Sequence, residues 1–327
     1  MSIINKLEIF KKQIKIYYRL QINHKKFVKN KTWYFYIFTF PIFGYFFYLI
    51  IKFVFLTNSN FFMKFLSYKI FMSSIRFLNS KEKIKISKII PEYNNYQNLI
   101  FSNNFLGNKK ISLIQKELTE DGLSNLGVIF SKQDCEGFIT SLNNQKCFNS
   151  QTQLQSDGVD LKFNPNKEPF NNNTSSYFCF GPTTNMAFEA LKIFLENKDL
   201  KNIIDNYLGF DSSIYFNSTW YNPTSNEKHY VHRLHRDYDD YKFLGLAIYW
   251  NDINEHNGPL EYVKGSHLDE SIIGPPTLLT GSAGTVIITD NFGLHRGNQV
   301  IKNERYTSTI RFGKYFNVSS VNCGFLS

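Results

Sequence analysis

The residues His235, Asp237 and His295 constrain the fold of this chain more than any other feature of its sequence. His235 and Asp237 are two positions apart, so on an extended strand both side chains project to the same side and can bind one metal ion. A third ligand must then come from a distant segment that passes close by. The β-branched segment 284–289 is a suitable strand, and it places His295 in a glycine-flanked turn just beyond its end. The pattern therefore predicts strands that are distant in the sequence and meet at a metal site.

Two histidines and one carboxylate form a donor set that can hold Fe(II) on one face and leave the opposite face open for a cosubstrate and oxygen. Zinc is the weaker interpretation, because structural zinc sites more often use cysteine and the four cysteines of this chain show no paired spacing. The alternative is that the three groups are unrelated surface residues. His229 and His232 are expected to be solvated, and His267 is expected to fix a loop through hydrogen bonds to the backbone.

Four ordered elements surround these residues. They are the His-Arg-Asp-Tyr-Asp-Asp segment at 235–240, the Asn-Gly-Pro turn at 257–259, the Gly-Ser-His turn at 265–267 and the late pair His295 and Arg305. From about residue 118 to residue 316 the chain resembles the phytanoyl-CoA dioxygenase family of Fe(II)- and 2-oxoglutarate-dependent oxygenases, in which these elements occur in this order. The chain departs from the family at position 245, where it has glycine and close relatives often have a larger polar residue.

The resemblance implies a mainly β catalytic domain, a double-stranded β-helix of the jelly-roll or cupin-like type with flanking helices. It implies that His235, Asp237 and His295 bind Fe(II) and that 2-oxoglutarate chelates the metal. The reaction it implies uses O2 to convert 2-oxoglutarate to succinate and CO2 while a small-molecule or lipid-type substrate is hydroxylated, with ascorbate as a candidate accessory cofactor. Related halogenases replace the carboxylate ligand with a small residue, so Asp237 favours hydroxylation. Desaturation and cyclisation use the same oxidant and stay open.

The resemblance also implies that the far carboxylate of 2-oxoglutarate meets Arg305, which makes Arg305 the fourth expected catalytic residue. A planar guanidinium suits a carboxylate, and Thr307 lies on the same strand face and could assist. Arg311 competes for this role, but it lies six residues further along the expected strand, about 20 Å away at ~3.3 Å per residue. Only one of the two arginines can reach a single cosubstrate, and the interval from His295 favours Arg305.

Two other functions are compatible with parts of this pattern. The spacing between Arg305 and Arg311 also occurs in oxidative nucleic-acid dealkylases, which share the iron chemistry. A non-enzymatic, cupin-like binding module is the second alternative, in which the three ligands hold a structural metal or none.

Charge divides the chain into two parts. Residues 1–88 contain 17 Lys and Arg against 2 Asp and Glu, a net charge of +15, which leaves −5 of the overall +10 for the remainder. The catalytic part therefore lacks a basic field that would attract nucleic acid, and nucleic-acid partners are not expected. The predicted organisation is a basic, aromatic-rich helical segment at 1–90, a linker at 91–117 and the oxygenase domain at 118–327.

The first ninety residues have the composition of a membrane-associating anchor. Residues 3–19 form a basic amphipathic pattern, and residues 33–51 are uncharged and apolar but interrupted by Pro41 and Gly44. Because lysines lie on both sides, we expect a re-entrant or in-plane anchor within residues 1–78 rather than a simple crossing. A helical hairpin packed on the catalytic domain is the alternative. Unpaired cysteines, Fe(II) and 2-oxoglutarate suit a reducing compartment, so the catalytic domain is expected at the cytoplasmic face of a membrane, with no expectation for its oligomeric state.

Overall fold

The computed structural model of the protein describes residues 41–57, 74–87, 105–107, 109–149, 161–162, 178–225 and 232–314. The chain divides into two compact units, one made mainly by residues 1–97 and the other mainly by residues 98–315. The predicted division at 90 and 117 stays a prediction. The expected amphipathic helix at 3–19 lies outside the described residues, as do residues 33–40 and most of the segment 149–176, which we expect to cover the site.

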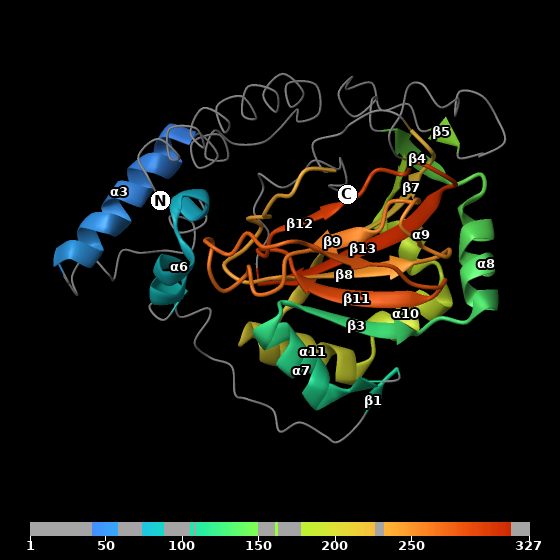
Figure 1. Cartoon of the computed structure of the whole chain (residues 1–327), viewed down its shortest axis with the longest axis horizontal. Helices are drawn as coiled ribbons and strands as arrows, with labels where there is room; N and C mark the ends of the chain where they lie inside the picture. Colours follow the sequence, from blue (N-terminus) through green and yellow to red (C-terminus); the bar gives the residue numbers. More distant parts are fainter. Residues whose placement is uncertain are drawn as a thin grey trace. The chain divides into compact units, whose positions relative to one another are not determined.

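An antiparallel sheet of eight strands forms the centre of the larger unit (Figure 1). Strands that are neighbours in this sheet come from distant parts of the sequence, so that β13 lies between β7 and β8, and β8 lies between β13 and β11. In spatial order the strands are β3 (Leu123–Val128), β11 (Thr285–Asp290), β8 (Leu244–Tyr249), β13 (Arg305–Gly313), β7 (Ser213–Asn222), β6 (Phe178–Phe180), β4 (Lys146–Asn149) and β5 (Leu161–Lys162).

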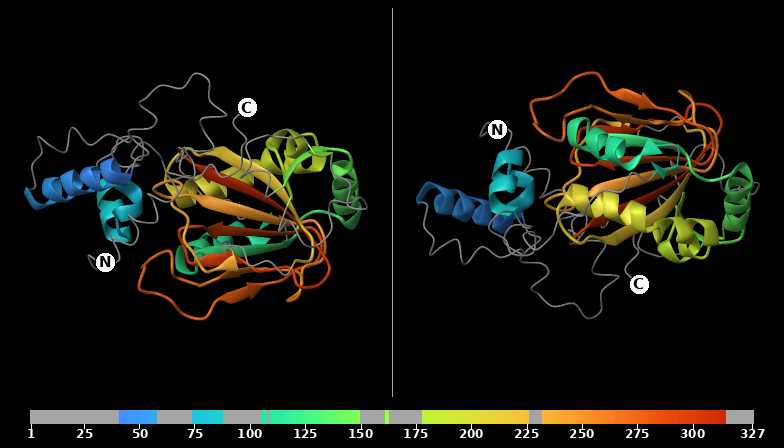
Figure 2. Two further views of the ribbon diagram at one scale, coloured as in Figure 1. Left: turned by 90° about the horizontal axis from the view of Figure 1, so that it is seen from above. Right: turned by 90° about the horizontal axis from the view of Figure 1, so that it is seen from below.

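A smaller antiparallel sheet contains β10 (Thr277–Leu279), β9 (Leu260–Tyr262) and β12 (His295–Gly297). The chain alternates between the two sheets, because β8, β11 and β13 belong to the large sheet while β9, β10 and β12 belong to the small one. Figure 2 shows the two sheets as separate layers. This arrangement is a double-stranded β-helix, and the predicted fold class is confirmed.

The apolar core of the β-helix lies between the two sheets. Tyr249 and Ile287 from the large sheet pack in one cluster with Tyr262 and Leu279 from the small sheet. Residues that lie opposite one another in β13, β8 and β11 point to the same face of the sheet. The inner face of β13 therefore carries Arg305, Thr307, Thr309 and Arg311. These residues are partly exposed, whereas the residues between them, which point to the outer face, are buried.

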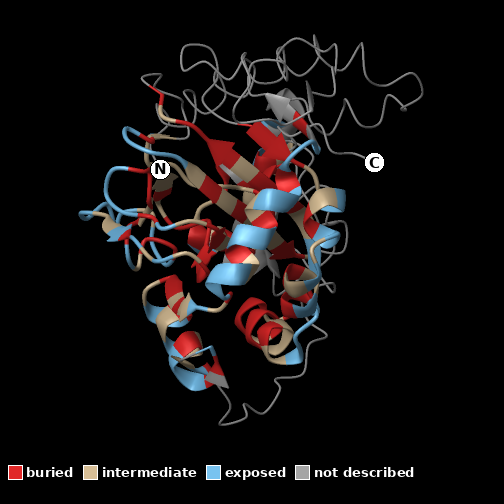
Figure 3. Ribbon diagram, turned by 90° about the vertical axis from the view of Figure 1, so that its right-hand side faces the viewer, coloured by how far each residue is buried: buried red, intermediate tan, exposed pale blue. Residues whose placement is uncertain are grey.

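Helices cover the outer face and one edge of the large sheet (Figure 1). They are α7 (Ile111–Glu120), α8 (Lys132–Leu142), α9 (Pro182–Met186), α10 (Glu189–Leu195) and α11 (Lys198–Leu208). Trp250, at the end of β8, donates its indole N–H to Ser308 on the outer face of β13 and stacks on Phe138 of α8 at 3.9 Å between ring centroids. Figure 3 shows buried strands in red behind helices whose outer faces are pale blue. The inner face is therefore the one that is free to build a site.

β11 lies at the predicted segment 284–289 and β13 at the expected strand from Arg305 to Arg311, whereas the start of the domain is shifted. The sequence favours a first strand at 128–130, but the strand is β3, which ends at Val128. Residues 118–120 belong to α7, and Gly122 takes a positive φ of 78° that turns the chain directly from this helix into β3.

The smaller unit contains α3 (Pro41–Thr57), the 3-10 turn η1 (Ile75–Phe77) and α6 (Ser80–Ser87). Tyr48 and Ile51 of α3 are buried, and the Tyr48 ring lies 6.1 Å from that of Phe77. The opposite face of α3 is apolar as well and stays exposed at Phe46 and Phe53. Within the described residues, none of the helices combines the length and the apolar character that crossing a bilayer requires.

Candidate metal centre

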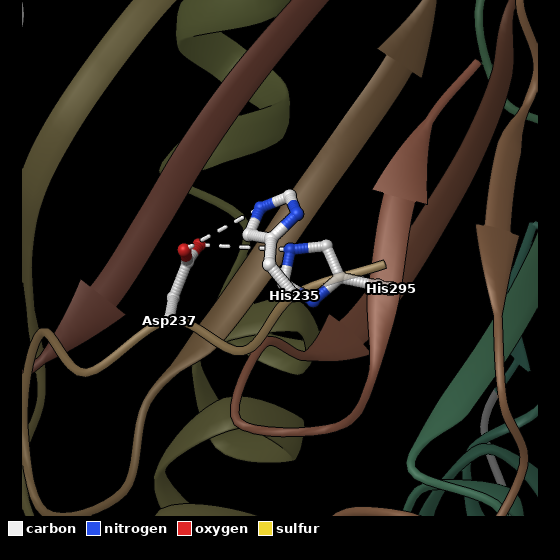
Figure 4. A group of neighbouring side chains, drawn as sticks. All are labelled: His235, Asp237 and His295. Carbon is white, nitrogen blue, oxygen red and sulfur yellow. Dashed lines mark ion pairs between the residues drawn. The ribbon is translucent and has the colours of Figure 1, made fainter. Parts of the chain in front are cut away.

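The side chains of His235, Asp237 and His295 converge in the structure (Figure 4). One ligand atom from each lies within 4.8 Å of the others. The Nε2 atom of His235 is 3.7 Å from Asp237 Oδ1, and the Nε2 atom of His295 is 3.6 Å from Asp237 Oδ2. Two ligands at right angles, each about 2.1 Å from one ion, lie about 3 Å apart. The measured separations exceed this value by about 0.6 Å to at most about 1.8 Å, so the three groups can share a single cation once their side chains rotate towards one another.

Backbone hydrogen bonds bring the two ligand segments together. The N–H of each histidine, His235 and His295, donates to the carbonyl of the other, and both distances are 2.9 Å. The sequence predicts an extended strand through 235–237, but only His235 forms a β-bridge among these three residues. The pairing stops there because the N–H of Asp237 donates instead to the carbonyl of Asn291, in the turn that follows β11.

Arg236 points away from its two neighbours, as the alternation of an extended segment predicts. Its Nη1 donates to the carbonyl of Ser266 and, at 2.8 Å, to that of Phe292, and its guanidinium lies 5.4 Å from the centre of the Phe292 ring. The hydroxyl of Ser266 accepts a hydrogen bond from the N–H of Leu294. The Gly-Ser-His turn thus holds both ligand segments, and Arg236 is the residue that joins them.

Hydrogen bonds fix the tautomers of both histidines. The Nδ1 atom of His235 lies 2.7 Å from the carbonyl of Arg233, and that of His295 lies 2.8 Å from the carbonyl of Gly293. A carbonyl can only accept, so both Nδ1 atoms carry the proton and both Nε2 atoms present a lone pair. Burial, together with the neighbouring His295, lowers the pKa of His235. Both features suit neutral imidazoles that bind a metal through Nε2.

The carboxylate of Asp237 is held by an arginine that the sequence predicted for a different role. Arg311 Nη2 lies 2.8 Å from Asp237 Oδ2. Burial opposes ionisation of Asp237, but the charge of Arg311 holds its pKa below the ordinary value. The carboxylate is therefore ionised and available as a ligand at neutral pH.

Asn291 is a residue of this site that the sequence did not identify. Its Nδ2 lies 3.5 Å from Asp237 Oδ2, and its Oδ1 accepts a hydrogen bond of 2.7 Å from Thr289. A Cβ at position 245 would lie only 2.4 Å from Asn291 Oδ1. The glycine at 245, where the family often has a larger polar residue, is thus explained, because Asn291 occupies the space above it. No local pattern in the sequence connects these two positions.

Arg305 begins β13 on its inner face and is surrounded by neutral groups. Its Nη1 donates to the carbonyl of Gly258, in the Asn-Gly-Pro turn, and at 3.3 Å to that of Asn298, while Nη2 lies 3.1 Å from Asn222 Oδ1. Burial lowers the pKa of Arg305 to about 10, so the group is still charged at neutral pH. Within the described part of the chain, no carboxylate forms an ion pair with Arg305.

Thr307 lies two residues further along the inner face of β13. Its hydroxyl is buried, and among the described residues no group forms a hydrogen bond with it. A buried hydroxyl without a partner loses about 1–3 kcal/mol of solvation, and this loss is recovered when a ligand supplies the hydrogen bond.

The remaining histidines behave partly as the sequence predicts. His267 Nε2 lies 3.2 Å from the carbonyl of Thr119, so this residue ties the Gly-Ser-His turn to α7 as expected. His232 is not freely solvated: it is partly buried, its Nδ1 lies 2.9 Å from the carbonyl of Gly297, and burial lowers its pKa. His229 lies outside the described residues.

No protein-family model and no curated protein matches this chain. Solved structures with a similar arrangement include EctD from S. alaskensis with bound Fe, at 17% identity and a TM-score of 0.46 over 68% of this chain and 81% of that one. A second is the non-heme alpha ketoglutarate dependent carbocyclase SnoK from nogalamycin biosynthesis, at 12% identity and 0.44 over 64% and 86%. A third is HygX from Streptomyces hygroscopicus with nickel and 2-oxoglutarate bound, at 11% identity and 0.43 over 62% and 86%. These are distant likenesses.

Proposed function

We propose that the protein is an Fe(II)- and 2-oxoglutarate-dependent oxygenase similar to the phytanoyl-CoA dioxygenase family. The observation that carries this proposal is the group of two histidines and one aspartate, with ligand atoms within 4.8 Å of one another. Such a set fills one face of an octahedral ion and leaves three positions open, which suits non-heme Fe(II) better than a closed structural metal.

His235, Asp237 and His295 would hold the iron. When bound, Fe(II) would supply the reaction of 2-oxoglutarate with O2, in which succinate and CO2 are released, one oxygen atom enters succinate and the other oxidises a C–H bond of the substrate. The residues of this chain would orient the reactants and keep the ligands deprotonated. Hydroxylation of a small-molecule or lipid-type substrate is the proposed outcome.

Arg305 is the proposed anchor for the far carboxylate of 2-oxoglutarate. β12 leads from His295 to the neighbourhood of Asn298, whose carbonyl contacts Arg305, a path of three residues or ~10 Å. A five-carbon dicarboxylate measures roughly 5 Å between its terminal carbons. With a metal–oxygen bond at one end and a hydrogen bond at the other, it covers about the same distance.

The surroundings of Arg305 support the same assignment. Among the described residues the hydrogen-bond partners of Arg305 are neutral, and a partly buried cation in such surroundings gains electrostatic stabilisation when an anion binds to it. The buried hydroxyl of Thr307 lies on the same strand face and offers the cosubstrate a hydrogen bond. Arg311, the competing anchor, already forms an ion pair with Asp237 and is less available for a distant carboxylate. This engagement also weakens the case for a nucleic-acid dealkylase, in which we would expect the basic groups to be open to phosphates.

We also propose that residues 1–78 associate with the cytoplasmic face of a membrane. The exposed face of α3 is made of large apolar side chains that are between 36% and 54% exposed, namely Tyr45, Phe46, Leu49 and Phe53. An apolar helix face next to abundant lysine is typical of segments that bind anionic lipid surfaces. Phe46→Asp should weaken binding to anionic vesicles by tenfold or more, and equal binding by this variant would contradict the proposal.

Succinate release tests the catalytic proposal. Native protein with Fe(II), 2-oxoglutarate and O2 is screened against candidate substrates, beside His235→Ala and a matched control, His256→Ala, which removes an exposed imidazole that lies 3.3 Å from Glu255. We expect release by the native protein and by the control, and none by His235→Ala. Protein that binds Fe(II) and 2-oxoglutarate but never turns over would favour the non-enzymatic binding module.

A further inference from the structure

We propose that Arg311 and Asn291 together hold one oxygen of Asp237 and so restrict this carboxylate to a single metal bond. The inference rests on the proposed function and deepens it. It concerns the two oxygens of one ligand, which lie in different surroundings. Oδ2 lies 2.8 Å from Arg311 Nη2 and 3.5 Å from Asn291 Nδ2, which are both hydrogen-bond donors. The ligand nitrogens do not distinguish the oxygens, since Nε2 of His295 is 3.6 Å from Oδ2 and Nε2 of His235 is 3.7 Å from Oδ1. Neither Nε2 carries a proton in the tautomers fixed by the carbonyls of Gly293 and Arg233.

Arg311 is held in place independently of Asp237. It lies on the inner face of β13, and its guanidinium carbon is 5.2 Å from the centre of the Phe216 ring. Phe216 is its direct neighbour across the β13–β7 pairing, so both backbones fix this contact. A guanidinium that stacks on an aromatic ring loses little further freedom when it binds a carboxylate.

Asn291 reaches Oδ2 from a different element and is also fixed. It follows β11, its amide oxygen accepts a hydrogen bond from Thr289, and it fills the space above Gly245. The carbonyl of Asn291 accepts the N–H of Asp237, so the backbone and the side chain of one residue both contact the ligand. Two elements of the large sheet, β13 and β11, therefore converge on the same oxygen.

This arrangement has a consequence for the metal. A carboxylate that binds through both oxygens takes two coordination positions, whereas one that binds through a single oxygen takes one. An oxygen that accepts a charge-assisted hydrogen bond at 2.8 Å is a weaker metal ligand than its free partner. A metal held by Oδ1 and the two histidines would keep three of its six positions open for the proposed cosubstrate chemistry. Arg311 is thus a positioning residue that acts through Asp237.

Cobalt(II) is a suitable probe, because its visible absorption reports coordination number without turnover. Native protein, Arg311→Leu, Arg311→Lys and Asn291→Ala are titrated with Co(II) and then with 2-oxoglutarate, without substrate. A matched control is Arg296→Leu, which removes an arginine paired with Glu261 rather than with a ligand. We expect Arg311→Leu to shift the spectrum towards higher coordination number and to weaken 2-oxoglutarate binding to the Co(II) protein by about tenfold or more.

Arg311→Lys keeps the charge, so its Co(II) spectrum and its 2-oxoglutarate affinity should lie between those of Arg311→Leu and the native protein. Asn291→Ala should change the spectrum and the affinity in the same direction as Arg311→Leu, but less. Native-like spectra and 2-oxoglutarate affinity in Arg311→Leu and Arg311→Lys alike would overturn the inference and leave the proposed function intact. Native protein that does not bind Co(II), or His235→Ala that binds it equally well, would overturn the proposed function and the inference with it. If Arg311→Leu fails to fold, Arg311→Lys and Asn291→Ala decide the outcome.

Discussion

Replacement of Gly245 by alanine tests the packing beneath the proposed metal ligand Asp237. Gly245 lies in β8, and a Cβ there would be 2.4 Å from Oδ1, 2.8 Å from Nδ2 and 2.9 Å from Cγ of Asn291. Non-bonded heavy atoms prefer separations of about 3.5–4.0 Å, so the alanine fits only if the Asn291 side chain leaves its position. Rotation of this side chain removes its hydrogen bond with Thr289 and its contact with Asp237.

The magnitude follows from those lost contacts. A buried amide that loses its partners costs about 1–3 kcal/mol, so Gly245→Ala should lower the free energy of unfolding by that amount. Loss of a group that supports a metal ligand typically weakens metal binding by 10- to 100-fold, and we expect the same here. Chemical denaturation of the metal-free protein and Co(II) titration measure the two effects.

A double-mutant cycle identifies the cause. Gly274→Ala is the matched control, since a Cβ there would meet nothing within 4 Å, and it should change stability by less than about 0.5 kcal/mol. Asn291→Ala removes the group with which the new methyl collides. In that background Gly245→Ala should cost almost nothing, so the two changes should be strongly non-additive. Additive effects, or a Gly245→Ala variant as stable as the control, would refute the reasoning.

Three further predictions follow from the same contacts. Arg305→Gln should weaken 2-oxoglutarate binding by about 10- to 100-fold and leave Co(II) affinity unchanged, because it removes the proposed cosubstrate anchor and no proposed metal ligand. Calorimetry measures both affinities, and an equal loss of metal affinity would contradict the prediction. Arg236→Met should lower the free energy of unfolding by about 1–3 kcal/mol, because the carbonyls of Ser266 and Phe292 lose their donor. It should also weaken Co(II) binding, because Arg236 joins the two ligand segments. A variant with native Co(II) affinity would be evidence against this joining role. Burial lowers the pKa of His232, His235 and His267 below 6.5 in the folded protein. The contribution of these three neutral histidines to stability is therefore fully present above pH 6.5 and is lost as the pH falls towards their folded-state pKa values. The loss is up to about 1.4 kcal/mol per pH unit for each histidine. Denaturation of the metal-free protein between pH 7.5 and 5 measures this loss, and a flat profile would exclude it.

The sequence predicts the parts of this molecule that depend on local patterns. The β-branched segment 284–289 predicts β11, and the expected strand from Arg305 to Arg311 predicts β13, both close to their observed bounds. The two-residue spacing of His235 and Asp237 predicts that their side chains lie on the same side of the segment. In the structure both side chains lie close to that of His295. The assignment of these residues to iron stays a proposal.

The parts that the sequence does not predict depend on register and on turns. The contact between Arg311 and Asp237 arises because β13 pairs with β8 so that Arg311 lies opposite Gly245, and no local pattern fixes that register. Asn291 reaches Asp237 only through the shape of the turn after β11. The burial of His232 depends in the same way on its contact with Gly297, 65 positions further along the chain.

Anaerobic titration with Fe(II) and 2-oxoglutarate tests the central claim most directly, because a 2-oxo acid chelated to Fe(II) absorbs visible light. The account predicts one Fe(II) per chain and a visible absorption band that appears only when 2-oxoglutarate is added to the native protein, and no band for His235→Ala. Absence of the band in native protein, or a band of equal intensity in His235→Ala, would contradict it.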